Sequence, residues 1–314
     1  MAEKKRLFTG LQSSGALHIG NYFGALKPFL DIYQNYDSYL MIADYHALTS
    51  LKNPAELREN IFNTVRDYLG IGVDPQKAVI FQQSRISEHT EAAWIFDCLV
   101  TTAFLELGHA YKDKVAKGLE ANVGLFTYPM LMAADILLYD TDIVPVGEDQ
   151  RQHVEYAREA AAKFNTTYGK TFTEPKEFIQ KEIAIVPGTD GKKMSKSYGN
   201  TIPLFGTKDE IAKAVMSIVT DSEGDKPENV YAIHKLLHSE EQLAQLYESN
   251  RGSYKALKEA LTEDLEAFIA PMRERRNSIS NDEVKRVIDE GSAKAKAYAS
   301  KKMEKVRQRV GITL

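Results

Sequence analysis

The distribution of hydrophobic positions divides the chain into two parts. Up to about residue 206, short apolar runs that suit buried strands alternate with amphipathic segments that suit helices. The strand candidates are residues 7–9, 39–44, 77–82, the start of 142–150, and 182–186. After Thr207 the strand pattern stops and five segments with helical periodicity follow. The pattern predicts an α/β fold with a doubly wound parallel sheet, followed by an all-helical C-terminal part.

Local signals place several helices in the first part. Residues 53–56, Asn-Pro-Ala-Glu, combine an N-cap, a proline at the first helical position and an early glutamate, so a helix should run to about Gly70. A second helix is expected over 87–100 with Ser87 as its cap, and a third follows residue 150. Residues 111–118, YKDKVAKG, suggest a basic mobile loop. Solvation explains its lysines more simply than a phosphate contact from Lys112 or Lys114 does.

Composition narrows the class of protein without naming a function. The 314 residues are 43% hydrophobic and 27% charged, and no apolar run of about 18 residues predicts a membrane span. The N-terminal residues enter a strand directly and lack the apolar stretch of a secretory signal. The single cysteine, Cys98, cannot form an internal disulfide and is expected in the core. We therefore expect a cytoplasmic protein, and the net charge of −4 does not by itself indicate a nucleic-acid binder.

The stretch from Leu7 to Gly24 is the first candidate site. A buried strand ends here, Gly10 and Gly15 bracket a turn, and a helix is expected soon after His18. A strand, a glycine-rich turn and a helix start expose backbone N–H groups that can bind an anion. Neither a Walker loop nor a GxGxxG spacing is present. An ATP site and a purely structural connection both remain possible on this stretch alone.

Asp135 is the second candidate, because it is a carboxylate inside the apolar stretch 124–139. This stretch is expected to be a helix with Pro129 near its first turn. Tyr128, Met132 and Asp135 would share one face with Tyr139. A buried ionised carboxylate costs several kcal/mol unless it is paired. Asp135 could cap a neighbouring strand or meet an arginine, or it could accept a hydrogen bond from a ligand N–H.

The third candidate is the run Lys193-Met194-Ser195-Lys196-Ser197, which ends a glycine-bearing loop over 187–192. Its two lysines lie three residues apart, beside two serines. In a flexible segment they can close over a polyphosphate and stabilise the charge that develops on it.

Taken together, these pieces resemble known signatures. His18-Ile19-Gly20-Asn21 is similar to the His-Ile-Gly-His element of class I aminoacyl-tRNA synthetases, and 193–197 is similar to their lysine-serine loop. TYPMLMAADILLY, DIVPVGEDQRQHVE and TDSEG extend the resemblance to the bacterial tryptophanyl-tRNA synthetase family over nearly the whole chain. The resemblance implies a Rossmann-like catalytic domain over 1–206, including the loop, and a helical anticodon-binding domain over 207–314.

The resemblance also implies an activity. Tryptophan and ATP with Mg²⁺ would give tryptophanyl-adenylate and pyrophosphate, and the aminoacyl group would pass to the 3′ end of tRNA(Trp). No tightly bound cofactor and no protein metal site are implied, and the protein would be a homodimer. The ATP-binding residues would be Gln12, Ser13, Ser14, Gly20, Asn21, Gly147, Glu148, Asp149, Val186, Lys193, Met194, Ser195, Lys196 and Ser197. The tryptophan-binding residues would be Asp135, Met132, Tyr128, Gln150, Phe8, His46, Val144 and Val146. Catalysis would depend on Lys193, Lys196 and Lys114 at the pyrophosphate.

The helical part offers two basic clusters for tRNA. Arg273, Arg275 and Arg276 form one cluster, and the lysine-rich last helix, with Lys301, Lys302 and Lys305, forms the other. Unstacked anticodon bases are read by side chains and by guanidinium planes, so the arginines are the candidates for specific reading. The lysines should supply salt-dependent affinity; a solvated helix face is their simplest alternative explanation.

Two departures and two rival functions qualify the resemblance. The family commonly has Pro at the position of Ser13, and Thr-Gln where this chain has His109-Ala110. A pantothenate-synthetase-like or nucleotide adenylyltransferase would share the signature at residues 18–21. It would lack the motifs at 142–150 and 193–197 and the long helical C-terminal half. A catalytically idle RNA-binding paralogue would be expected to have lost a loop lysine or part of the ATP turn, and both are intact here.

Overall fold

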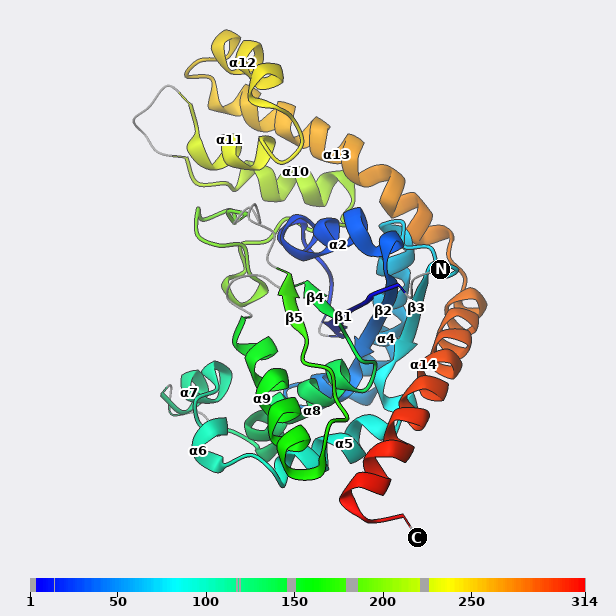
Figure 1. Ribbon diagram of the computed structural model, residues 1–314. Coiled ribbons are helices and arrows are strands. Elements are labelled where there is room, and N and C mark those ends of the chain that lie inside the picture. Colours follow the sequence, from blue (N-terminus) through cyan, green and yellow to red (C-terminus); the bar gives the residue numbers. More distant parts are fainter. Residues whose placement is uncertain are drawn as a thin grey trace.

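In the part of the chain that the structure describes, five parallel strands form the centre of the protein (Figure 1). The computed structural model describes residues 4–13, 15–116, 118, 120–145, 151–178, 186–220 and 226–313. The strands are β1 (Arg6–Gln12), β2 (Asp37–Ala43), β3 (Ala78–Gln82), β4 (Ile143–Pro145) and β5 (Lys176–Phe178). Their order is β3-β2-β1-β4-β5, which confirms the predicted doubly wound parallel sheet. The strand expected at 182–186 lies outside the described residues except for Val186, and β5 was not predicted.

The two faces of the sheet bury different sets of side chains, because successive residues of a strand point to opposite sides. Leu7 and Leu40 pack on one side, and Phe8 and Met41 pack on the other. The first side is covered by α1 (Ile19–Asn21), a π-helical turn (Tyr22–Leu26), α2 (Lys27–Ile32) and α4 (Pro54–Gly70). The second is covered by α5 (Glu88–Asp97), α8 (Val123–Leu137) and α9 (Arg151–Tyr168). Three short helices connect these elements in the sequence. Helix α3 (Asp44–Ala47) lies between α2 and α4, and α6 (Thr102–Leu105) and α7 (His109–Ala116) lie between α5 and α8.

Local sequence signals predicted some helix boundaries better than others. Asn53 caps α4 as expected, since its side-chain oxygen accepts from the backbone N–H groups of residues 55 and 56 at 3.0 and 3.3 Å. Ser87 precedes α5 but makes no capping hydrogen bond. Pro129 lies inside α8, one turn later than expected.

Two expectations from the sequence are wrong. Residues 111–116 belong to helix α7 and not to a loop; a contact between the Tyr111 and Phe126 rings, whose centroids are 5.0 Å apart, attaches α7 to α8. Cys98 is exposed and not in the core. It follows the last residue of α5, whose Phe96 points inward while Trp94 is 70% exposed.

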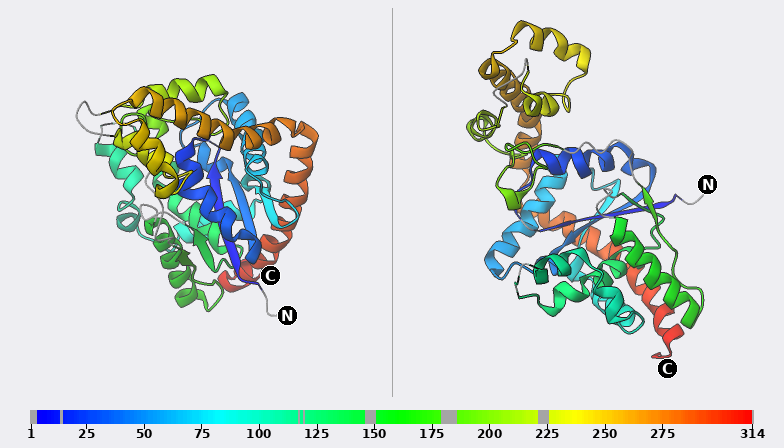
Figure 2. Two further views of the ribbon diagram at one scale, coloured as in Figure 1. Left: turned by 90° about the horizontal axis from the view of Figure 1, so that it is seen from above. Right: turned by 90° about the vertical axis from the view of Figure 1, so that its left-hand side faces the viewer.

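In the described residues of the C-terminal part, helices joined by short connections are the regular secondary structure, as predicted. It consists of α10 (Lys208–Met216), α11 (Glu228–His234), α12 (Glu240–Ser249), α13 (Tyr254–Ser278) and α14 (Asn281–Val310). Helices α10 to α12 and the first half of α13 form a lobe that projects from the sheet (Figures 1 and 2). No helix within the described ranges combines the length and the apolar character needed to cross a membrane.

The last helix does not belong to this lobe, because α14 returns along the outer strand β3 (Figure 1). At Gly291 the helix approaches the strand so closely that an added Cβ would lie 1.8 Å from the carbonyl oxygen of Ile80. Side chains of α14 belong to the hydrophobic cores on both sides of the sheet, with Val287 in the core that contains Leu7 and Ala299 in the core that contains Phe8. Residues 281–310 are thus a structural layer of the Rossmann-like half, although they follow the lobe in sequence.

We predict that Gly291→Ala destabilises the protein. Alanine normally stabilises a helix interior by about 0.5–1 kcal/mol relative to glycine, but here the methyl group meets the backbone of β3, and such overpacking costs about 1–3 kcal/mol. Urea unfolding measures the difference. Gly24→Ala is the matched control, because a Cβ at this helical glycine has no neighbour within 4 Å. Equal stability of the two variants would show that α14 does not pack this closely.

Candidate active site

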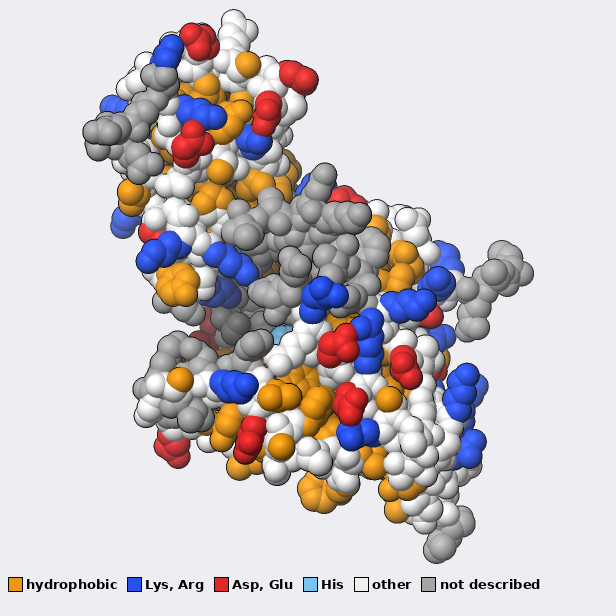
Figure 3. All heavy atoms as spheres, turned by 60° about the vertical axis from the view of Figure 1, so that its left-hand side comes forward, with side chains coloured by type: hydrophobic (Ala, Val, Ile, Leu, Met, Phe, Trp, Pro, Cys, Tyr) orange, Lys and Arg blue, Asp and Glu red, His pale blue; other side chains and the backbone are white. Residues whose placement is uncertain are grey.

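A cavity of about 610 Å³ opens at the carboxyl ends of β1 and β4. These strands are neighbours in the middle of the sheet, where the strand order reverses, which is where doubly wound sheets bind their ligands. The surface is hollowed between the lobe and the main body, and Lys and Arg side chains lie on the lobe side of the hollow (Figure 3). The lining residues that matter here are Phe8, Gln12, Asn21, His46, Tyr128, Met132, Asp135, Val144, His153 and Lys196.

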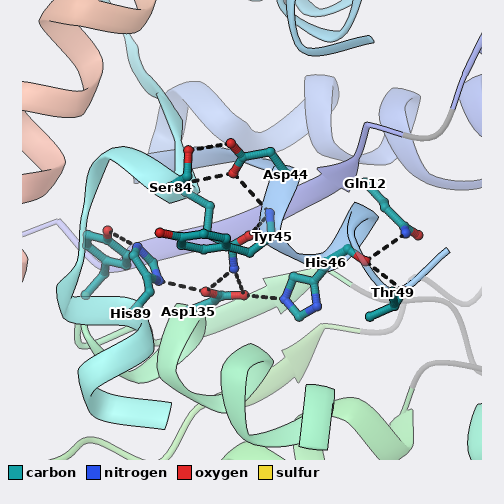
Figure 4. A network of polar contacts seen from close by, with 10 residues as sticks. Gln12, Asp44, Tyr45, His46, Thr49, Ser84, His89 and Asp135 are labelled. Atoms are coloured by element: carbon teal, nitrogen blue, oxygen red, sulfur yellow. Dashed lines mark hydrogen bonds and ion pairs between the residues drawn. The ribbon is translucent and has the colours of Figure 1, made fainter. Parts of the chain in front are cut away.

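Asp135 lies at the inner wall of the cavity, and its carboxylate is held by three protein donors (Figure 4). His46 Nε2 lies 2.8 Å from Oδ2, and His89 Nδ1 lies 2.6 Å from Oδ1. Gln83 Nε2 donates to both oxygens at 2.8 and 3.0 Å. An ionised carboxylate only accepts, so the two histidine nitrogens that face it are the protonated ones. This arrangement matches neither structural alternative raised from the sequence, a strand cap or an arginine pair.

The network determines the charge of Asp135. Burial acts to raise the pKa of Asp135, but hydrogen bonds from His46 and His89 lower it further than burial raises it, to about 2. The carboxylate is therefore ionised at neutral pH. On the far side of His89, Nε2 lies 2.8 Å from the hydroxyl of Tyr139, whose pKa is raised well above its ordinary value by burial and by the charge of Asp135. The tyrosine hydroxyl therefore stays protonated at neutral pH.

His89 and Gln83 were not singled out from the sequence. Gln83 follows the carboxyl end of β3, and His89 is near the start of the apolar helix α5. A polar side chain directly after a buried strand, and a histidine near the start of an apolar helix, are signals that could have identified both residues as candidates. Their pairing with a residue about 50 positions away depends on tertiary structure.

Aromatic and aliphatic side chains line the cavity beside Asp135. Phe8 stacks on Tyr139 with ring centroids 5.8 Å apart, and Met132 and Val144 line the same space. The Tyr128 ring meets His46 edge to face at 6.4 Å. The structure thus brings five predicted tryptophan-site side chains and Asp135 to one cavity. Val146 and Gln150 lie outside the described residues.

The predicted ATP turn forms the next part of the wall. His18 and Asn21 cap the helix start reciprocally: the Asn21 side chain accepts from the His18 N–H at 3.1 Å, and His18 Nδ1 accepts from the Asn21 N–H at 3.2 Å. Burial and the charge of Lys196 lower the pKa of His18 to about 4, so the ring is neutral at pH 7. A Cβ at Gly20 would lie 2.9 Å from that ring. Gln12 donates to the His46 carbonyl at 3.2 Å.

Of five further residues in the predicted ATP site, the structure describes only Ser13. Ser13 is buried, and its hydroxyl has no hydrogen-bond partner among the described residues. Ser14, Gly147, Glu148 and Asp149 lie outside the described residues.

The lysine-serine loop packs directly against the turn. Lys196 Nζ donates to the carbonyl of Gly15 at 3.0 Å, and partial burial lowers its pKa. Met194 is buried and its N–H donates to the carbonyl of Val186 at 2.9 Å. Asn200 holds the loop by accepting from the Ser195 N–H and donating to the Lys193 carbonyl. The Ser197 side chain is outside the described part, and Lys114 lies on α7 and is not among the residues that line the cavity.

Comparison with known proteins agrees with this geometry. The family model described as "tRNA synthetases class I (W and Y)" matches residues 1–289. The chain belongs to this family. A tryptophan–tRNA ligase of Fusobacterium nucleatum is 47% identical over 98% of both chains, and one of Rhodopirellula baltica is 42% identical over 98% of this chain and 99% of its own. A crystal structure of the Campylobacter jejuni tryptophanyl-tRNA synthetase with ADP and tryptophan has a TM-score of 0.91 at 43% identity, and covers 98% of this chain and 99% of its own.

The three arginines expected to read tRNA are engaged within this synthetase chain. Arg273 pairs with Glu266 at 2.5 Å and donates to the Gly206 carbonyl at 2.6 Å. Arg276 pairs with Asp67 of α4 at 2.5 Å. Arg275 donates to the Gly70 carbonyl at 2.9 Å. These contacts attach α13 to the Rossmann-like half, so the guanidinium groups do not form an open cluster.

The lysines of the last helix are not equivalent either. Lys302 is only 9% exposed at its side chain, pairs with Asp140 at 2.5 Å and donates to the Thr171 carbonyl at 3.0 Å. Lys301 and Lys305 are exposed on the same helix. Lys302 therefore attaches α14 to the body, so the solvated-face explanation is wrong for this residue, and the role of the lysines in tRNA affinity stays a prediction.

Proposed function

We propose that this chain is a tryptophan–tRNA ligase that makes tryptophanyl-adenylate from tryptophan and ATP and transfers the aminoacyl group to tRNA(Trp). The observation that carries the proposal is the ionised Asp135 in an apolar cavity beside the glycine turn. The family match and relatives of up to 47% identity named tryptophan–tRNA ligase support it. Such an enzyme would act in the cytoplasm.

Tryptophan would be recognised through its indole N–H. That group can only donate, and Asp135 can only accept. Of the three donors on Asp135, His46 alone lines the cavity, and its side chain is 15% exposed while that of His89 is fully buried. The indole N–H would therefore approach Oδ2 on the side of His46 and share or replace its hydrogen bond. Phe8, Met132, Val144 and Val146 would enclose the ring, and Tyr128 and Gln150 would hold the amino group.

ATP would lie between the turn and the lysine-serine loop. Gln12, Ser13, Ser14, Gly20 and Asn21 would contact it from the turn, Gly147, Glu148, Asp149 and Val186 would contact the ribose and adenine, and Met194, Ser195 and Ser197 would contact it from the loop. The tryptophan carboxylate attacks the α-phosphorus and pyrophosphate leaves, so no protein nucleophile is needed. Lys193, Lys196 and Lys114 would stabilise the leaving charge. Among the described residues that line the cavity, Asp135 is the only carboxylate, so Mg²⁺ would be held mainly by the phosphates.

We further propose that the protein is a homodimer that binds tRNA across both subunits. Exposed apolar side chains on the body, with Trp94 at 70% and Val123 at 76% exposure, offer a surface that association would bury. Sedimentation as a monomer at micromolar concentration would contradict this.

Selectivity for tryptophan over tyrosine tests the proposed function. In ATP–pyrophosphate exchange the protein should prefer tryptophan, and Asp135→Ala should lower the preference by about 10- to 100-fold, since a buried N–H without a partner costs about 1–3 kcal/mol. The tryptophan/tyrosine ratio is its own control, because partial misfolding lowers both rates equally. Faster exchange with tyrosine in the unaltered protein would rule the proposal out.

Lys196→Ala should slow adenylate formation by about 10²-fold or more while tryptophan binding changes little, because the charge that Lys196 meets grows in the transition state. Rapid-quench measurement of adenylate formation gives the rate, and tryptophan fluorescence titration gives the affinity. Lys192→Ala is the matched control, an exposed lysine of the same loop that does not line the cavity. If Lys196→Ala and Lys192→Ala slow adenylate formation to the same extent, the overall charge of the loop and not Lys196 in particular is responsible.

The helical lobe is proposed to bind the anticodon, and Arg273, Arg275 and Arg276 to take part in tRNA recognition. Their contacts suggest that they act by fixing the position of α13. A comparison of Arg276→Ala with Asp67→Ala separates this from direct reading of bases. If Arg276 positions the lobe, both variants should impair tRNA charging to a similar degree, several-fold or more. If Arg276 alone impairs charging while both retain pyrophosphate exchange, it reads the tRNA directly.

A further inference from the structure

A second group of histidines and a carboxylate lies in the helical lobe, away from the active site. His234 ends α11, His238 follows four residues later, and Asp264 lies on α13. His234 Nε2 lies 2.7 Å and His238 Nε2 lies 3.1 Å from the same oxygen, Oδ2 of Asp264. The three potential ligand atoms lie within 4.8 Å of one another, and no other group of three such residues in the described ranges meets this condition.

The backbone holds the two imidazoles in this arrangement. The N–H of His238 donates to the carbonyl of His234 at 3.1 Å, which continues the helical i, i+4 pattern past the end of α11. Residues at this spacing project from the same side of a helix. Histidine pairs four residues apart are a recurring metal-binding element for this reason.

The surroundings of His234 suit a ligand. Its ring is fully buried, and its Nδ1 lies 3.1 Å from the hydroxyl of Tyr247. Metal-bound histidines usually donate their second ring N–H to such a partner, which fixes the tautomer with the lone pair toward the metal. Burial lowers the pKa of His234 more than Asp264 raises it.

Access and polarity are also suitable. The side chains of His238 and Asp264 are 36% and 35% exposed, which leaves a route for an ion and room for a water ligand. Lys235 and Glu240, which are close in sequence to His234 and His238, form an ion pair, so their charges cancel. Glu228 and Asp264 contribute negative charge near Tyr247.

We propose that His234, His238 and Asp264 bind one divalent transition-metal ion of the Zn²⁺ class, with water as the fourth ligand. Two imidazoles and one carboxylate suit zinc or cobalt better than Mg²⁺ or Ca²⁺, which prefer oxygen ligands. Metal–ligand distances of about 2.0–2.2 Å in a tetrahedron separate the ligand atoms by roughly 3.3–3.6 Å. As the ion replaces the protons, Asp264 Oδ2 would move away from His234 Nε2, now at 2.7 Å, by roughly 0.6–0.9 Å and from His238 Nε2, now at 3.1 Å, by roughly 0.2–0.5 Å. The bound ion would attach the end of α11 to α13 within the lobe.

Cobalt provides the direct test, because tetrahedral Co²⁺ absorbs visible light and zinc displaces it. The titration uses the full chain carrying Cys98→Ser, which removes the exposed thiol as a competing ligand. We expect one Co²⁺ per chain with visible absorption bands that Zn²⁺ abolishes, and Zn²⁺ should raise the thermal midpoint in proportion to log concentration. The absence of saturable binding below about 100 μM would overturn the proposal and leave a hydrogen-bonded histidine–carboxylate cluster.

Variants separate this site from other histidines, including those of the active site. His238→Ala should weaken Co²⁺ binding by at least the 10- to 100-fold that loss of even an outer partner causes, and Asp264→Asn should do the same. Asp282→Asn on α14 is the matched control, since its side chain is 94% exposed. ATP–pyrophosphate exchange should be unchanged in His238→Ala, which shows that the chain is folded. Unaltered Co²⁺ binding in His238→Ala would assign the ion elsewhere and refute the site.

Discussion

The ionised carboxylate of Asp135 is the constraint on which the catalytic half depends. It is 1% exposed, and a buried charge without partners would cost several kcal/mol. Its partners come from three elements: His46 from α3 after β2, Gln83 from the end of β3, and His89 from α5. The ends of two strands and the start of one helix must therefore be in position around α8. The contacts that make the charge tolerable in the core also shape the wall of the cavity, so the stability and the specificity of this region share one cause.

The phosphate side of the cavity depends on contacts between distant parts of the sequence. Lys196 reaches the carbonyl of Gly15, the N–H of Ile19 donates to the carbonyl of Ile202, and His18 forms an isolated bridge with Pro203. Burial raises the pKa of Asp67, and the charges of Arg276 on α13, its ion-pair partner, and of Lys196 act against that rise. Lys196 of the loop, Asp67 of α4 and Arg276 at the end of α13 are thus neighbouring charges. A chain with net charge −4 can bind polyphosphates and RNA because such local arrangements decide the potential.

The sequence predicted features that depend on neighbours along the chain, and it missed those that depend on tertiary packing. The Asn53 cap follows from four consecutive residues, and the anomalous Asp135 is visible because its helix is otherwise apolar. Nothing local identifies His89 as its partner, since the pairing requires the packing of α5 on α8. Helix α14 was grouped with the lobe because they are adjacent in sequence, whereas Gly291 attaches it to β3. Residues 111–116 have the composition of a basic loop, but the contact between Tyr111 and Phe126 packs them as a helix against α8. Several predicted ATP residues lie outside the described chain, so their roles stay predictions.

The chain contains the same set of groups twice, two imidazoles and one aspartate, and geometry gives the sets different capacities. At Asp135 the imidazoles meet different oxygens, His89 on Oδ1 and His46 on Oδ2, and Gln83 bridges both. They approach from separate sides, so each orients the carboxylate and no single ion could take all three groups. At Asp264 both imidazoles converge on Oδ2 from one helical turn, and the carboxylate is partly open to solvent. Convergence on one point is what chelation requires, and divergence is what holds an acceptor rigid for a ligand. The direction of approach, more than residue type, therefore separates a substrate-recognition site from a candidate metal site.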